Sequence, residues 1–86
     1  MPRISEFFGV AIYMYYRDHL PPHFHDIYGQ FDAAVGIDRI EIIAGTLPRR
    51  LQSLVFEWAR LYQKELRANW GLTRRRLPLR RIPPLE

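Results

Sequence analysis

The chain has 86 residues, a length that supports one domain with a thin core and excludes a large multidomain enzyme. It contains no cysteine, which excludes disulfides and thiolate zinc sites, and no apolar run approaches the roughly 18 residues of a membrane span. With a formal net charge of +4 and no apolar leader at its start, it is expected to be a soluble cytoplasmic protein that does not bind membranes.

The first half of the sequence predicts strands. Residues 7–16 are rich in aromatic and β-branched side chains and are apolar on both alternating faces, which predicts a central strand or one whose second face meets a partner. Proline at residues 21–22 breaks this pattern, and a second strand is expected over 23–28. Residues 31–37 alternate cleanly and predict a half-buried strand, residues 40–44 are expected to form a fourth strand, and the short connections favour antiparallel pairing.

A helix is predicted next. Thr46 is placed to cap it, and Pro48 is tolerated in a first helical turn. Asn69 and Trp70 are expected to end the helix, with Gly71 as the C-cap. Phe56 lies outside the stripe of apolar side chains along one side of this helix and is either exposed or in contact with a second subunit. The stripe repeats every 3.6 residues and contains Leu51, Leu54, Val55, Trp58, Leu61, Tyr62 and Leu66.

The chain changes character after this helix. Residues 72–86 hold five arginines and three prolines, so we expect an extended segment that is flexible unless it docks. The elements together predict an α+β fold, in which a small antiparallel sheet of three to four strands packs against one long C-terminal helix. The predicted organisation is a single domain over residues 1–71, followed by a basic, proline-containing tail over 72–86.

Charge is divided between the two halves. Residues 1–45 carry three arginines against six carboxylates, whereas residues 46–86 carry ten basic groups against three glutamates. Twelve of the thirteen basic residues are arginine, whose planar fork suits phosphates and carboxylates. This predicts an anionic partner, either nucleic acid or an acidic protein, and the alternative is a solvated helix face and tail. The candidate binding residues are Arg67, Arg74, Arg75, Arg76, Arg80 and Arg81.

All three histidines fall within seven residues, at His19, His23 and His25. Histidine changes charge near neutral pH and is the commonest metal ligand, so this cluster is where the sequence concentrates chemistry. His23 and His25 are two apart on an expected strand and therefore point to the same face. Asp18 and Asp26 are near enough in sequence to ligate a metal or to orient an imidazole.

Three interpretations of the cluster remain open. His19, His23 and His25, with Asp18 as a further ligand or a supporting carboxylate, are candidates for a divalent metal such as zinc. The same histidines with Arg17 are candidate catalytic residues for acid–base cleavage of RNA, which needs a base, an acid and a cation. In the third interpretation the histidines only cap the Pro-Pro turn, and Phe24 enters the core.

Several segments together resemble a known family. They are residues 2–10 (PRISEFFGV), 14–25 (MYYRDHLPPHFH), 45–50 (GTLPRR), 57–58 (EW) and 69–70 (NW). They are similar to the bacterial domain-of-unknown-function 4160 family, over nearly the whole chain up to Trp70. The segment Asp-His-x-Pro-Pro-His-x-His is the most specific part of the likeness.

The resemblance implies a small cytoplasmic bacterial protein that binds a partner protein or nucleic acid, because genes of this family often lie beside a second small gene in a layout similar to toxin–antitoxin modules. It supplies no catalytic residue. The first functional hypothesis is therefore a toxin–antitoxin-like binding module, and the alternative is a histidine-dependent hydrolase acting on RNA through metal or acid–base chemistry. The thin core and twelve aromatic residues also favour a homodimer.

Overall fold

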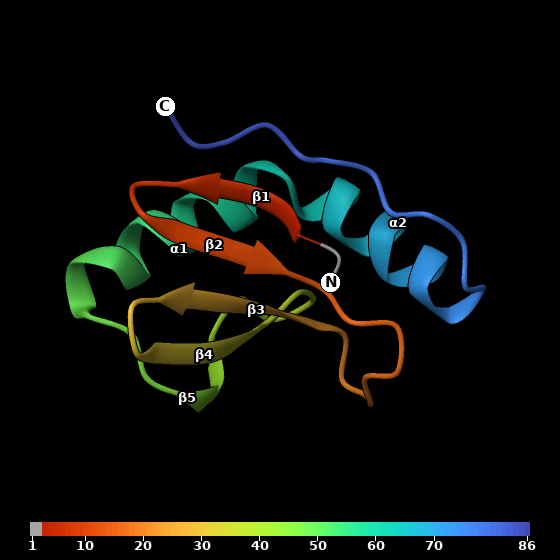
Figure 1. The fold of residues 1–86 in the computed structure, drawn as a ribbon, viewed down its shortest axis with the longest axis horizontal. Coiled ribbons are helices and arrows are strands. Elements are labelled where there is room, and N and C mark those ends of the chain that lie inside the picture. Colours follow the sequence, from red (N-terminus) through yellow and green to blue (C-terminus); the bar gives the residue numbers. More distant parts are fainter. Residues whose placement is uncertain (1–2) are drawn as a thin grey trace.

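The computed structural model describes residues 3–86, and Pro2 of the segment that carries the family resemblance lies outside this range. The fold is α+β, with five antiparallel strands in the spatial order β1-β2-β3-β4-β5 and two helices (Figure 1). The predicted class is confirmed, but the sheet has more strands than expected and the helix is divided. The elements are β1 Arg3–Phe7, β2 Val10–Tyr13, β3 His23–Tyr28, β4 Phe31–Gly36, β5 Ile42–Gly45, α1 Arg49–Leu61 and α2 Gln63–Arg74.

The additional strand arises because the expected strand over residues 7–16 contains a turn. Phe8 and Gly9 both adopt positive φ angles, 50° and 80°, and Phe7 pairs directly with Val10 across them. Two consecutive residues with positive φ make the tight turn whose twist matches that of paired strands. The single long strand was therefore wrong, and Gly9 is the residue that could have signalled the hairpin.

Both helices lie on one side of the sheet (Figure 1). Trp58 of α1 is fully buried, and its ring lies 5.1 Å from that of Phe7 and 5.6 Å from that of Phe24. These contacts join the helix to β1 and β3 and form the centre of the core. Other fully buried apolar side chains of this core are Ile12, Met14, Val35, Ile37, Val55 and Leu66.

The helical segment is interrupted at Tyr62, whose φ of −115° lies outside the helical range. Hydrogen bonds continue across the break, from Tyr62 N to Trp58 O at 3.0 Å and from Leu66 N to Tyr62 O at 2.9 Å. Leu61, which the periodic pattern placed on the buried stripe, is the last residue of α1 and is 64% exposed. Neither helix of residues 3–86 is long and apolar enough to cross a membrane.

The ends of the helical segment also differ from expectation. The N-cap is Pro48 rather than Thr46, and it makes no side-chain hydrogen bond. At the other end α2 continues through Gly71 and is capped at Arg75, because Gly71 has no positive φ and the last turn is closed by the Arg75 N–H. Phe56 is half-buried and packs against the core.

The C-terminal segment docks onto the domain. The Ile82 N–H donates to the Ile4 carbonyl at 2.8 Å, so the chain runs back beside β1 (Figure 1), and the Ile82 side chain is 3% exposed. The Asn69 amide donates to the Arg80 carbonyl at 2.9 Å and accepts from the Arg80 N–H at 3.0 Å. Residues 77–86 are thus extended, as predicted, but held by backbone pairing and burial.

The two faces of the sheet have different surroundings. On β3, Phe24 and Asp26 point toward the helices and are fully buried, whereas His25 and Ile27 belong to the opposite face and are half-buried. Tyr13 pairs with His25 and shares that second face. Within the described chain no helix covers this face, which is called the open face below (Figure 1).

Candidate metal centre

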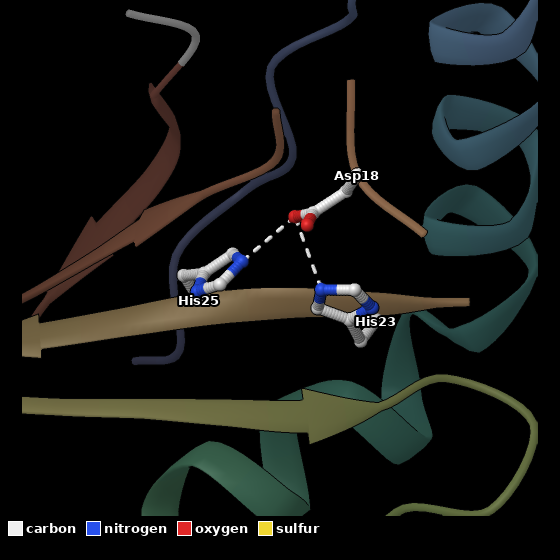
Figure 2. Close-up of side chains that lie close together, drawn as sticks. All are labelled: Asp18, His23 and His25. Carbon is white, nitrogen blue, oxygen red and sulfur yellow. Dashed lines mark hydrogen bonds and ion pairs between the residues drawn. The ribbon is translucent and has the colours of Figure 1, made fainter. Parts of the chain in front are cut away.

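Three side chains converge where β3 begins. Asp18 lies in the loop between β2 and β3, and its Oδ2 is 2.8 Å from His25 Nε2 and 3.0 Å from His23 Nε2 (Figure 2). The two histidines share one face of β3 because they are two residues apart. A single carboxylate oxygen therefore faces two imidazole nitrogens.

The cluster is partly shielded from solvent. The exposed fraction of the side chain is 3% for His23, 20% for His25 and 17% for Asp18. Burial acts to raise the pKa of Asp18, but the hydrogen bond from His25 and the neighbouring charge of His23 outweigh it, so that the pKa lies below its ordinary value. Asp18 is thus a carboxylate anion at neutral pH.

The hydrogen bonds of His23 restrict its protonation. Its Nδ1 lies 2.7 Å from the Pro21 carbonyl oxygen, which can only accept, so Nδ1 carries a proton. Its Nε2 faces the Asp18 carboxylate, which also only accepts. In a neutral imidazole, Nε2 would then direct a lone pair at an anion. A proton or a metal ion between these two atoms would make the contact favourable.

The donor set fits a divalent transition metal. Asp18, His23 and His25 each offer one atom that could bind a metal ion, and these three atoms lie within 4.8 Å of one another. Ligand atoms around tetrahedral zinc are about 3.3 Å apart, since each bond is about 2.0–2.1 Å long. The two oxygen–nitrogen distances, 2.8 Å and 3.0 Å, lie within about half an ångström of this value, whereas ligand atoms up to 4.8 Å apart would have to move closer when a metal binds. The Nδ1–H to Pro21 bond is the type of contact that fixes a ligating tautomer.

Aromatic rings support both imidazoles. The His23 ring lies 5.4 Å from Trp70 of α2, and the His25 ring lies 4.7 Å from Tyr15. The guanidinium of Arg74 stacks on Trp70 at 4.3 Å, which places a cation beyond that ring. Trp70 and Tyr15 were not predicted as site residues. The Trp70 contact depends on where α2 crosses the sheet, which local sequence does not encode.

The remaining predicted site residues lie outside the converging group. His19 is exposed, and its ring centre is 5.7 Å from that of His23. Its Nδ1 lies 3.0 Å from the Leu20 carbonyl oxygen, which only accepts, so Nδ1 carries a proton, and in the neutral ring Nε2 is an acceptor. Arg17 is exposed beside Asp18.

Asp26 does not reach the site, so its suggested role beside the histidines was wrong. It follows His25 directly and therefore points to the opposite face of β3, into the core. Burial, with a smaller contribution from the charge of Asp32, raises its pKa well above the ordinary value.

The candidate arginines occupy the second helix and the docked segment. Arg67 donates to Asp38 Oδ1 at 2.8 Å. Arg74 stacks on Trp70. Within residues 3–86 the others have no carboxylate within ion-pair distance, and all are exposed: Arg75, Arg76, Arg80 and Arg81.

Comparison with known proteins shows which family this chain belongs to. The sequence model of the family described as "Domain of unknown function (DUF4160)" matches residues 9–71, which include all of the converging cluster. No curated protein and no solved structure gave a significant match.

Proposed function

We propose that this chain, which belongs to the DUF4160 family, binds a divalent transition-metal ion through Asp18, His23 and His25 and uses it to hydrolyse RNA. The observation that carries the proposal is the His23 ring, whose Nδ1 donates to a carbonyl while Nε2 faces a carboxylate. A dication would be held by all three atoms at once, and the alternative is a second proton on His23 beside the hydrogen bond that His25 donates to Asp18.

The number of ligands supports a catalytic site over a purely structural one. Structural zinc sites are closed by four protein ligands, whereas catalytic sites have three and keep one position for water. A zinc ion held by these residues would supply a hydroxide nucleophile near neutral pH, and hydrolysis of a phosphodiester would then break the bond from phosphorus to the leaving oxygen, which takes up a proton. His19, with Nε2 free to accept, is the neighbouring group suited to move a proton.

Metal binding is tested by titrating zinc into metal-free protein and measuring heat. We expect one ion per chain, and His23→Gln or His25→Gln should weaken affinity by about 100-fold or more, because each variant removes a ligand. His19→Gln is the matched control and should bind zinc as the wild type does. Wild-type affinity in His23→Gln would contradict the site.

Hydrolysis is tested with a single-stranded RNA and each of zinc, manganese and magnesium. Cleavage should require metal and disappear in His25→Gln, while His19→Gln should bind metal normally and cleave more slowly. Cleavage that persists with chelator and is lost only on histidine substitution would instead support metal-free acid–base catalysis. Tight zinc binding without cleavage would leave a metal-binding module.

A second function is favoured by the arginines that have no carboxylate partner. Four of them lie exposed on the end of α2 and the docked segment, a pattern suited to an anionic surface. We propose that they bind nucleic acid, either as the RNA substrate or as the target of a toxin–antitoxin-like module. An acidic partner protein encoded nearby and a homodimer are the alternative occupants, distinguished by co-purification and by light scattering.

A further inference from the structure

A groove lies on the open face beside the metal cluster. It has a volume of about 250 Å³ and is lined by His25 of β3, Asp32 and Ala34 of β4, and Ala44 and Gly45 of β5. His25, Ala34 and Ala44 are paired neighbours across the three strands. The groove therefore shares His25 with the proposed metal site but extends away from it toward the sheet edge.

The floor of the groove is flat because its residues have little or no side chain. Ala34 and Ala44 contribute methyl groups, and Gly45 contributes none. Gly45 has a φ of 76°, and a Cβ at this position would collide with the Asp32 carbonyl oxygen. The backbone therefore requires glycine here, and the flat floor suits a planar ring.

One wall of the groove is an aromatic ring held in place. The edge of His25 is fixed by the bond to Asp18, and Tyr15 packs against the ring at 4.7 Å. Tyr15 in turn stacks on Tyr13, with ring centres 6.1 Å apart and planes 17° apart. A ring braced in this way is a ready stacking surface, since its orientation is fixed before a ligand arrives.

The groove also holds a carboxylate without a partner. Asp32 is exposed, and in residues 3–86 its carboxylate makes no hydrogen bond or ion pair within the usual distances. Two carboxylate oxygens match two adjacent N–H donors on one edge of a ligand. Guanine presents such an edge, with N1–H beside the 2-amino group, whereas adenine, cytosine and uracil lack this pair of donors. A carboxylate also repels phosphate, so it selects a base rather than the backbone.

We propose that this groove binds an unstacked guanine base of a single-stranded nucleic acid, with the ring against His25 and the N1–H and 2-amino edge on Asp32. The inference deepens the proposed function, because a base held against His25 places its phosphodiester near the metal cluster. It assigns the substrate class, guanine-containing single strands, and makes Asp32 the residue that determines specificity.

The test is a titration of ¹⁵N-labelled protein with guanosine monophosphate, in which the backbone amide signals are monitored by NMR. We expect shifts at Ala34, Ala44 and Gly45, at least tenfold weaker binding of adenosine monophosphate, and an intermediate affinity for inosine monophosphate, which lacks the 2-amino group. Deoxyguanosine monophosphate in a parallel titration distinguishes DNA from RNA. Asp32→Asn should lose at least tenfold in guanosine monophosphate affinity and retain zinc binding.

A second variant separates the groove from the metal site. His25→Phe keeps an aromatic wall but removes a metal ligand, so it should bind guanosine monophosphate and lose zinc affinity. If Asp32→Asn is poorly folded, Ala44→Leu fills the groove instead and should abolish nucleotide shifts. Equal affinity for guanosine and adenosine monophosphates would overturn the inference. It would also be overturned if the amide signals of the groove shifted with an arginine ester, which offers paired N–H donors without a base, and not with guanosine monophosphate. Zinc binding without guanine binding defeats only this inference, and guanine binding without zinc binding defeats only the metal proposal.

Discussion

Asp26 is a carboxyl group buried on the helix side of the sheet. It is 0% exposed, and neither of its side-chain oxygens has a hydrogen-bond partner. Burial is the main cause of its raised pKa, and the charge of Asp32 adds to it. The neutral acid is therefore the form that the fold favours, and ionisation at higher pH opposes folding.

This residue makes stability depend on pH. The folded pKa lies above the unfolded value near 3.8, so the contribution of Asp26 to stability is fully present below pH 3.8 and is lost as pH rises through the folded pKa. Asp26→Asn cannot ionise, so its stability relative to the wild type should grow as pH rises from 4 to 8. Urea unfolding at several pH values measures this, and parallel curves for the two proteins would contradict it.

At the scale of elements, the C-terminal segment acts as part of the domain. Ile82 is buried and bonded to Ile4, and Pro83 accepts a hydrogen bond from the Trp58 indole at 2.8 Å. Ile82→Ala should therefore lower the free energy of unfolding by about 2–5 kcal/mol, measured by urea denaturation. Arg81→Gln changes the exposed neighbour and is the control, with an expected change within about 0.5 kcal/mol. An Ile82→Ala variant as stable as the control would show that the segment is not docked in solution.

Docking also changes how the basic segment should be studied. A truncation after Gly71 would remove the partners of Trp58 and Asn69 together with five arginines. Loss of binding in such a truncated chain would then report unfolding as well as lost charge. Substitution of Arg75, Arg76, Arg80 and Arg81 separates the two effects, because these side chains are exposed and lie outside the core.

The periodic elements were predictable, and the breaks in them were not. The apolar spacing of Val55, Trp58 and Leu66 places them on the buried side of the helices, as expected. The interruption at Tyr62 has no proline or glycine to signal it, and Leu61, which was assigned to the stripe, is exposed at the end of α1. Gly71 was read as a stop, yet it is accommodated inside α2 because its backbone stays helical.

The site was predictable only in part for a related reason. The spacing of His23 and His25 is enough to place both on one face of β3, and the same alternation places Asp26 on the other. The position of Trp70 against His23, and the tautomer fixed by the Pro21 carbonyl, depend on how the loop and α2 meet β3. Such contacts between distant segments have no periodic signature in the sequence.

At the scale of the whole molecule, the charge division of the sequence becomes a spatial one. The sheet and its loops carry most of the carboxylates, including Asp18 and Asp32, whereas six of the twelve arginines lie in the stretch from α2 to the docked segment. Trp70 connects the two regions, with the His23 ring and the Arg74 guanidinium both packed on it. An RNA strand could therefore place phosphates on the basic region while one nucleotide reaches the metal cluster.

This arrangement predicts how RNA binding responds to salt. Binding should weaken as salt is added, and on a logarithmic plot the slope changes by about 0.7 for each phosphate contact on a single strand. Replacing both Arg80 and Arg81 with glutamine should therefore reduce the slope by about 1.4, measured by fluorescence anisotropy with a labelled oligonucleotide. Arg67→Gln is the control and should change the slope less, because Arg67 is already paired with Asp38. An unchanged slope in the double variant would show that the RNA does not contact this surface, and the docked segment would then have a structural role alone.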